Sequence, residues 1–149
     1  MSLNKLNRMD QLYKAVIVER STHPKHRGQL AEATHEFTLL NPSCGDTVYV
    51  QIQVVDQRVE AVCFNGEGCA ISMASADIMA EVLQGKTLEE AEQLIEDFNA
   101  LVQGQPVAHL NQLGEAQAIE GVRQFPARIR CAQLAWKAFQ QAVDEDEVE

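Results

Sequence analysis

Residues 125–136 read FPARIRCAQLAW, and the rest of the chain can be organised around this stretch. Proline is tolerated in the first turn of a helix, because the amide proton that it lacks would have no partner there. We therefore expect a helix to begin at about Pro126 and to continue through Phe139. Apolar side chains recur along it at helical spacing, which predicts one buried stripe. The stripe consists of Ile129, Ala132, Trp136, Phe139 and Val143.

Cys131 lies beside this stripe, near the start of the helix, where unpaired amides and the helix dipole favour an anion. A thiolate would be stabilised at such a position. Arg128 precedes Cys131 by three residues and so lies on the same face of the helix. Arg130 is turned about 100° away from Cys131. We expect Arg128 to act at Cys131, and Arg130 to face solvent or a docking partner.

The bulk properties of the chain limit its function. Its 149 residues are 46% hydrophobic, which suits one compact domain over residues 1–143, followed by an acidic and disordered tail at residues 144–149. The net charge of −10 argues against a nucleic-acid partner. We find no membrane-spanning segment and no signal peptide, so we expect a cytoplasmic protein that does not act at a membrane. In that reducing compartment four cysteines are metal ligands, reactive thiols or core residues rather than disulfides.

Three segments alternate between apolar and polar residues as β-strands do, namely residues 33–40, 47–55 and 58–65. Asp56 and Gln57 form a tight turn between the last two, and Val62 and Phe64 face the core. Cys63 then lies on the opposite face as a small residue without a role in the site. We predict an α+β fold, with a three-stranded antiparallel sheet covered on one face by helices and a metal site at one end.

Helical periodicity fills the remainder of the chain. A first helix carries an apolar stripe and ends before residues 21–24, and another runs from Cys69 to residue 84. Thr87 and Glu90 form a capping box that opens the next helix. Residues 105–124 form a long excursion with one or two helical turns. The stripe of the first helix comprises Met9, Leu12, Tyr13, Val16 and Ile17.

Three cysteines occupy special backbone settings. Cys44 lies in the turn NPSCGD at residues 41–46, Cys69 begins a helix after the glycines of GEG at residues 66–68, and Cys131 is near the start of the last helix. With Asp46 they could form a tetrahedral site for zinc or iron. The intervals of 25 and 62 residues match no standard zinc module, so buried inert cysteines remain an alternative.

Three motifs in this order resemble the IscU/NifU N-terminal family of iron–sulfur cluster assembly proteins. They read NPSCGD at residues 41–46, GEGCAISMAS at residues 66–75 and FPARIRC at residues 125–131. The similarity runs from the first helix to Phe139 and is strongest to the SufU-type branch. Arg130 stands where the classical scaffold branch has a histidine, and residues 105–124 resemble the insertion of SufU-type proteins.

The resemblance implies a zinc site with Cys44, Asp46, Cys69 and Cys131 as ligands. It also implies a sulfur carrier that accepts persulfide sulfur from a pyridoxal-phosphate cysteine desulfurase of the SufS type. A histidine of that partner would take over one zinc position and release a cysteine thiolate. We expect Cys44 to be the sulfur acceptor, because it lies on a loop and can leave the metal without unravelling a helix. Arg128 would offset the negative charge and orient Asp46.

Two other functions stay open. The same four ligands could hold a [2Fe–2S] cluster on a scaffold that passes it to apo-proteins, or zinc could merely hold loops together in an adaptor domain. On the first interpretation the chain is a sulfurtransferase-like partner of the desulfurase rather than a free-standing enzyme, and its sulfur passes to a downstream scaffold or to apo-proteins. The basic loop HPKHRG at residues 23–28 is either a polar turn or a docking surface.

Overall fold

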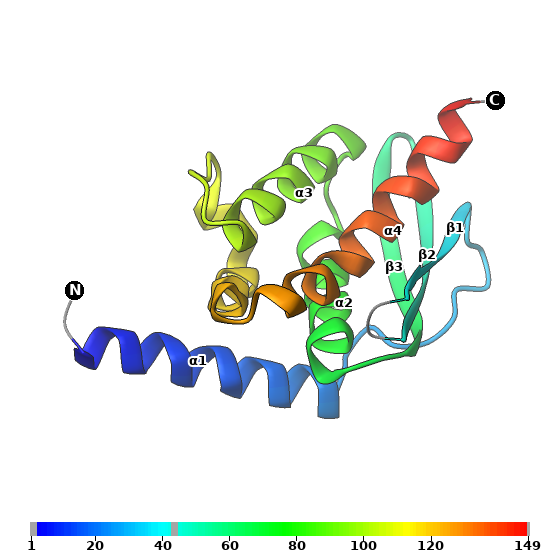
Figure 1. Cartoon of the computed structure of the whole chain (residues 1–149). Coiled ribbons are helices and arrows are strands. Elements are labelled where there is room, and N and C mark those ends of the chain that lie inside the picture. Colours follow the sequence, from blue (N-terminus) through cyan, green and yellow to red (C-terminus); the bar gives the residue numbers. More distant parts are fainter. Residues whose placement is uncertain (1–2, 43–44, 149) are drawn as a thin grey trace.

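The computed structural model describes residues 3–42 and 45–148, and three antiparallel strands form its sheet in the order β1-β2-β3 (Figure 1). The strands are β1 (His35–Asn41), β2 (Asp46–Val55) and β3 (Arg58–Glu67). The predicted strands are confirmed, with their ends moved by no more than two residues. Asp56 and Gln57 have φ angles of 50° and 65°, as expected for a tight hairpin turn whose twist matches that of the strands.

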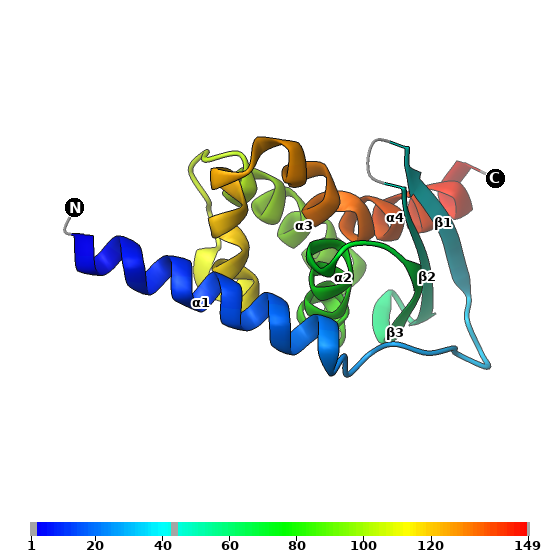
Figure 2. The same ribbon diagram turned by 60° about the horizontal axis from the view of Figure 1, so that its bottom comes forward.

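One face of the sheet is apolar and buried, as the alternation predicts. Val48, Val50 and Ile52 of β2 are fully buried, together with Val62 and Phe64 of β3. Helices cover this face (Figure 2). The other face carries polar side chains and the half-buried Cys63. The predicted α+β architecture is therefore confirmed.

The helices pack around a central one. They are α1 (Leu3–Thr22), α2 (Ala70–Leu83), α3 (Leu88–Val102), the 3-10 helices η1 (Leu110–Gln124) and η2 (Pro126–Arg128), and α4 (Ile129–Val148). Helix α2 is buried on nearly all sides, as expected for a helix in the middle of a core. The capping box at the start of α3 is present, with Thr87 and Glu90 each accepting a hydrogen bond from the other's backbone N–H.

Trp136 of α4 contacts both α3 and α2 and so holds the three helices together. Its ring is fully buried and stacks on Phe98 of α3, with ring centroids 4.0 Å apart. Its indole N–H donates to the hydroxyl of Ser75 on α2 at 3.0 Å, and that hydroxyl donates to the carbonyl of Ala132 at 2.6 Å. Because Ala132 follows Cys131 directly, this chain of hydrogen bonds fixes the first turn of α4 against α2.

Three predicted features differ in the structure. Pro126 opens a short 3-10 turn rather than the α-helix itself, which begins at Ile129. Leu12 is 56% exposed, because α1 presents only part of its predicted stripe to the core. The acidic tail was expected to be disordered, but α4 continues through it to Val148, since helix propagation adds one hydrogen bond per residue. The division at residue 143 stays a prediction, and Glu149 lies outside the described residues.

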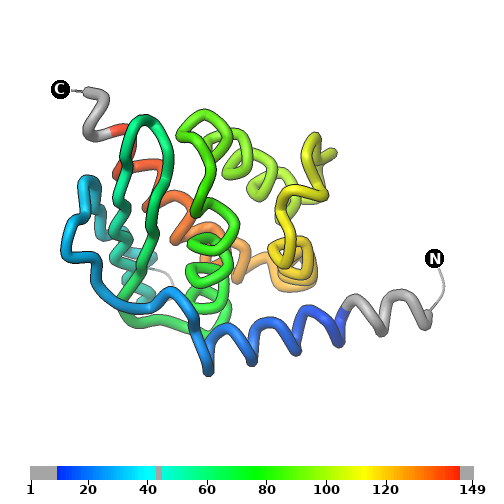
Figure 3. Tube along the Cα trace, turned by 180° about the vertical axis from the view of Figure 1, so that it is seen from behind, coloured from blue at the N-terminus to red at the C-terminus, as the bar shows by residue number. Residues whose placement is uncertain are grey.

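The excursion at residues 105–124 contains more regular structure than predicted. η1 buries four apolar side chains at intervals of three residues, which is the period of a 3-10 helix, and Gly114 interrupts it with a φ of 56°. Figure 3 shows from behind how α1 runs past both α2 and η1. The four side chains are Leu113, Ala116, Ile119 and Val122.

A cluster of charged side chains with a buried centre at Arg20 and Asp77 joins α1 to α2 and η1. The guanidinium of Arg20 is nearly inaccessible and donates to Asp77 at 2.8 Å, to Glu81 at 2.5 Å and to Glu115 at 3.1 Å. Burial by itself lowers the pKa of Arg20, but the hydrogen bonds to the three carboxylates outweigh burial and raise it. Asp77 also accepts from the backbone N–H groups of Lys25 and His26. We call Arg20, Asp77, Glu81 and Glu115 the arginine cluster.

Candidate metal centre

Three of the four predicted ligands meet at one end of the sheet. One ligand atom each of Asp46, Cys69 and Cys131 lies within 4.8 Å of the other two. Asp46 is the first residue of β2, Cys69 is the N-cap of α2, and Cys131 is in the first turn of α4. Asp46 and Cys131 are buried, and Cys69 is partly exposed. We call these three residues the thiol cluster.

Asp46 is held in place by the start of α2. Its Oδ1 accepts a hydrogen bond from the backbone N–H of Cys69 at 2.9 Å, and its Oδ2 lies 4.0 Å from the Cys69 Sγ. Gly68 permits this approach, because a Cβ there would lie 2.6 Å from both the Asp46 Oδ1 and the Ser72 hydroxyl. The close packing of Asp46 and Ser72 therefore explains why the second glycine of the GEGC motif, Gly68, has no side chain.

Two further polar residues touch the sulfur atoms. The side-chain amide of Asn41 donates toward the Cys131 Sγ at 3.8 Å, and the Ser72 hydroxyl lies 3.6 Å from the Cys69 Sγ. Neither residue is among the ligands that the motifs predict. Their positions carried a signal, because Asn41 opens the NPSCGD motif and Ser72 follows Cys69 at helical spacing. Hydrogen bonds of this kind orient the ligands of a metal and tune their charge.

Tyr13 of α1, which belongs to the predicted apolar stripe of that helix, is a third polar residue near the site. Its side chain is 4% exposed, and its hydroxyl has no hydrogen-bond partner within the described part of the chain. Burial raises the pKa of the Tyr13 phenol, negative charge at Cys69 and Cys131 adds to this rise, and Arg128 opposes it. The phenol is therefore within electrostatic range of both thiols and of Arg128.

The other predicted residues divide into three groups. Cys44 lies outside the described residues. Arg128 is an exposed residue of η2, whereas Arg130 lines a groove between α4 and β1. Cys63 lies on the polar face of the sheet, where burial raises the pKa of its thiol. The proximity of Asp46, Cys69 and Cys131 agrees with the predicted ligand set, and the separate roles of Arg128 and Arg130 stay predictions.

The donor set fits a divalent soft or borderline metal ion. Two sulfur atoms and one carboxylate oxygen converge from three elements, and zinc accepts sulfur and carboxylate oxygen donors in tetrahedral sites. A tetrahedron with zinc–sulfur bonds of about 2.3 Å has edges of about 3.8 Å. The three atoms are therefore within roughly 1 Å of coordinating distances, and small side-chain rotations would close the difference.

Comparison with known proteins gives the family. A family profile described as "NifU-like N terminal domain" matches residues 12–132 of this chain. A structure from Fervidobacterium islandicum, described as a candidate scaffold protein for the SUF iron–sulfur assembly system, has a TM-score of 0.83 and 31% sequence identity. The match covers 89% of this chain and 96% of that one.

Two curated relatives carry different names. The iron–sulfur cluster assembly scaffold protein IscU of Streptococcus pyogenes is 41% identical over 96% of this chain and 87% of its own length. The zinc-dependent sulfurtransferase SufU of Bacillus subtilis is 37% identical over 93% of this chain and 94% of its own length. The chain thus belongs to the NifU-like N-terminal domain family of iron–sulfur cluster assembly proteins. Among the described residues, none of the helices combines the length and apolar character that crossing a bilayer requires.

Proposed function

We propose that this protein is a zinc-dependent sulfur carrier, which accepts persulfide sulfur from a pyridoxal-phosphate cysteine desulfurase and passes it on for iron–sulfur cluster assembly. The observation that carries the proposal is the convergence of the Asp46 carboxylate with the Cys69 and Cys131 sulfur atoms. The name of the Bacillus subtilis relative supports zinc and sulfur transfer together. Arg130 stands immediately before Cys131, where the classical scaffold branch has histidine, and this also favours the sulfur carrier.

The ligand set would be Cys44, Asp46, Cys69 and Cys131. When bound, zinc would hold the cysteines as thiolates and protect them from oxidation. A carboxylate is a harder donor than a thiolate, so Asp46 would be the weakest of the four ligands. Its backbone contact to Cys69 keeps the carboxylate near the centre even when it does not bind metal. The site can therefore open without losing its shape.

Cys44 would carry the transferred sulfur. Its thiolate attacks the outer sulfur of the donor's cysteine persulfide, a new S–S bond forms at Cys44, and the donor's S–S bond breaks to leave a cysteine thiolate. Sulfur moves as a neutral atom, so no external oxidant or reductant is needed. Cys69 and Cys131 emerge from helix starts, where movement would break regular structure, and this makes them poorer acceptors.

Arg128 would stabilise the excess negative charge of the site. Two or three thiolates and a carboxylate carry more charge than a divalent ion neutralises, and a guanidinium can balance it through charge-assisted hydrogen bonds. Such a bond contributes about 1.5–3 kcal/mol. We expect Arg128→Ala to lower zinc retention or sulfur acceptance about tenfold or more with partner binding intact, and Arg128→Lys to restore part of the loss. Equal defects in Arg130→Ala would contradict this assignment.

The deciding experiment measures turnover of a cysteine desulfurase with and without this protein, alongside the zinc content of each variant. The wild type should stimulate turnover, and Cys44→Ser should abolish the stimulation. Cys63→Ser is the matched control, because Cys63 lies on the polar face of the sheet and should behave as the wild type. Full stimulation by Cys44→Ser would overturn the sulfur-carrier proposal and favour an adaptor with structural zinc.

A scaffold for a [2Fe–2S] cluster is the second candidate, supported by the name of the Streptococcus pyogenes relative. The same residues would then hold the cluster before its transfer to apo-proteins. Metal content and the visible spectrum of the purified protein separate the two functions. One equivalent of zinc and no colour support the carrier, whereas a brown protein with two equivalents of iron supports the scaffold.

A further inference from the structure

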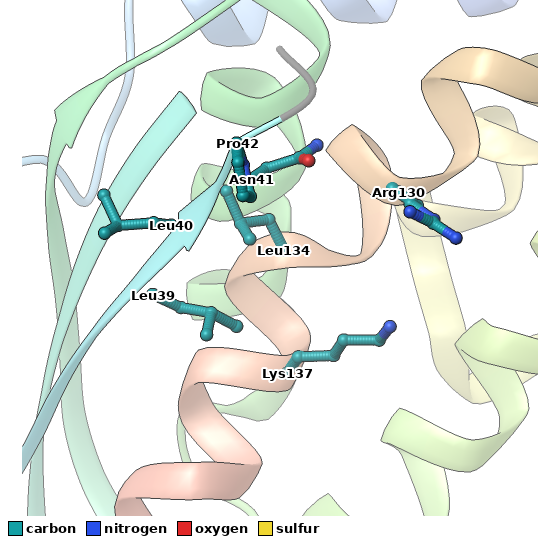
Figure 4. A pocket seen from close by; sticks show the side chains of 7 residues that line it. All are labelled: Leu39, Leu40, Asn41, Pro42, Arg130, Leu134 and Lys137. Carbon is teal, nitrogen blue, oxygen red and sulfur yellow. The ribbon is translucent and has the colours of Figure 1, made fainter. Parts of the chain in front are cut away.

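The side chain of Asn41 links the end of β1 to the metal centre. Asn41 is 6% exposed, and its amide donates toward the Cys131 Sγ at 3.8 Å. Figure 4 shows this side chain extending from the end of β1 toward the first turn of α4, whereas Leu40 lies on the other side of the strand. Asn41 also lines a groove of about 320 Å³ between β1 and α4. Its side chain therefore lies between this groove and the Cys131 sulfur.

Cys131 is the less accessible of the two thiols in the thiol cluster. It is fully buried, whereas Cys69 is partly exposed. The carbonyl of the next residue, Ala132, accepts from the Ser75 hydroxyl at 2.6 Å, which fixes the backbone beside Cys131 against α2. Asn41 adds a donor at the sulfur atom itself. Cys131 thus has the properties of a ligand that stays in place.

A hydrogen bond to a sulfur atom changes what that sulfur can do. A donor that bonds to the charged form of an acid stabilises that form, so an amide beside a thiol favours the thiolate that a metal binds. A thiolate also becomes a weaker nucleophile as its basicity falls. A hydrogen-bonded thiolate is therefore better suited to remain on a metal than to attack a persulfide.

The backbone of Asn41 has separate contacts that a side-chain substitution can preserve. Its carbonyl accepts from the Gly45 N–H at 2.9 Å, and Asn41 pairs with Asp46 at the end of the β1–β2 ladder. These contacts use main-chain atoms, which every residue type except proline supplies. Substitutions of Asn41 therefore test its amide at the Cys131 sulfur rather than the shape of the turn.

We propose that Asn41 is a positioning residue, which keeps Cys131 on the metal as a ligand that takes up no sulfur itself. When Cys44 leaves the metal to accept sulfur, Asp46, Cys69 and Cys131 would have to hold zinc without it. The amide of Asn41 stabilises the Cys131 thiolate during this step and makes it a poor competitor for the sulfur. The inference rests on the proposed function, because it takes Cys44 as the sulfur acceptor.

Asn41→Leu is the principal test variant, because leucine has nearly the shape of asparagine and no donor. Asn41→Gln keeps an amide donor, and the neighbouring groove has room for its additional methylene group. Asn99→Leu is the matched control. It makes the same substitution on α3, where the Asn99 oxygen accepts from Gln133 of α4 at 3.3 Å, so it removes a hydrogen bond to α4 that involves no sulfur atom. Should Asn41→Leu fail to fold, the smaller Asn41→Ala gives the same comparison.

The first measurement uses Co²⁺ alone in place of zinc, because its absorption spectrum contains a sulfur-to-metal charge-transfer band. Loss of a hydrogen bond raises the energy of the sulfur electrons, so Asn41→Leu should move this band to longer wavelength. Asn41→Gln and Asn99→Leu should keep it near its wild-type position. A competition titration with a zinc chelator should show that Asn41→Leu lowers the affinity for zinc about tenfold or more, whereas Asn99→Leu leaves it unchanged.

The second measurement follows zinc during sulfur transfer. Zinc-loaded protein is mixed with a pyridoxal-phosphate cysteine desulfurase and cysteine, and a chromogenic chelator reports the zinc released. Mass spectrometry of the alkylated peptides locates the transferred sulfur. We expect the wild type to carry sulfur on Cys44 and to keep its zinc, and Asn41→Leu to release zinc severalfold faster than Asn99→Leu.

Three results would overturn the role of Asn41. They are an unshifted cobalt band with wild-type zinc affinity in Asn41→Leu, transferred sulfur on Cys131 of the wild type, and an unshifted band with equal losses of zinc affinity in Asn41→Leu and Asn41→Gln. The last result would make Asn41 a merely structural residue. If the wild type takes up no sulfur on any cysteine, the proposed function fails, whereas the cobalt band and the zinc affinities still decide whether Asn41 holds Cys131.

Discussion

Helix α2 contributes to two polar clusters that differ in how their charge is balanced. The arginine cluster contains its own cation, and Arg20 donates hydrogen bonds to all three of its carboxylates. The thiol cluster instead gathers one carboxylate and two sulfur atoms, which are acceptors and potential anions. Both clusters join elements that are far apart in the sequence, and the arginine cluster has a cation of the chain, Arg20, hydrogen-bonded at its centre.

This difference separates a structural cluster from a functional one. A buried charge is costly unless it is paired, so the chain meets the cost of Asp77 with Arg20 and with two backbone N–H groups. A group of converging thiols and a carboxylate is stable when a metal ion supplies the positive charge. The first cluster should therefore control folding, and the second should control metal binding and chemistry.

The sharpest test of this comparison is Arg20→Met, which removes the cation and leaves Asp77 buried. Breaking a buried pair in this way costs about 3–5 kcal/mol of unfolding free energy. Urea denaturation should show a loss of this size, whereas Lys14→Met, which removes an exposed pair with Asp10, should cost less than about 1 kcal/mol. A loss below 1 kcal/mol for Arg20→Met would show that the arginine cluster is not structural.

Removing the metal from the thiol cluster should lower the unfolding free energy by less than Arg20→Met does, and it should leave the fold intact. Chelation should lower the unfolding free energy by about 3 kcal/mol relative to protein with free zinc at 100 times its Kd. The far-UV helical signal should persist, because Trp136, Phe64 and the rest of the core do not depend on the metal. Circular dichroism before and after chelation checks this, and loss of the helical signal would make the zinc site structural.

Asp46→Ala tests the weakest ligand of the thiol cluster. We expect zinc to be retained with an affinity lowered about 10- to 100-fold, and sulfur acceptance to be altered rather than abolished. Asp46→Asn is the matched control, since its side-chain oxygen can still accept from the Cys69 N–H while its charge is removed. A competition titration with a zinc chelator gives the affinities. Complete loss of zinc in Asp46→Ala would show that the thiols alone do not hold the metal.

The smallest effect should come from Tyr13→Phe. The substitution removes a buried hydroxyl that has no partner among the described residues and keeps the ring stacked on Phe125. Because an unsatisfied buried polar group costs free energy, the variant should be more stable by about 1 kcal/mol. Tyr49→Phe should instead be slightly less stable, since the Tyr49 hydroxyl donates to Glu36 at 2.6 Å. Destabilisation by Tyr13→Phe would indicate that the hydroxyl has a partner in solution.

Local patterns in the sequence determined the elements of the fold. The two-residue alternation of residues 47–55 gave β2 and its buried face, Thr87 and Glu90 gave the start of α3, and the turn at Asp56 and Gln57 gave the hairpin. These features depend on hydrogen bonds and side-chain directions within a few residues, so the local sequence predicts them without knowledge of the tertiary structure. The three-residue spacing of apolar side chains in η1 was equally local and was overlooked.

The candidate ligands could be named from the sequence through the resemblance of three motifs, but not through their spacing. Only the tertiary structure brings Asp46, Cys69 and Cys131 within 4.8 Å, because α2 and α4 are fastened together by Ser75 and Trp136. The burial of Arg20 between α1, α2 and η1 and the unpartnered hydroxyl of Tyr13 were likewise decided by packing. Distances between segments 23 and 62 residues apart depend on how the helices pack on the sheet, and no local pattern encodes them.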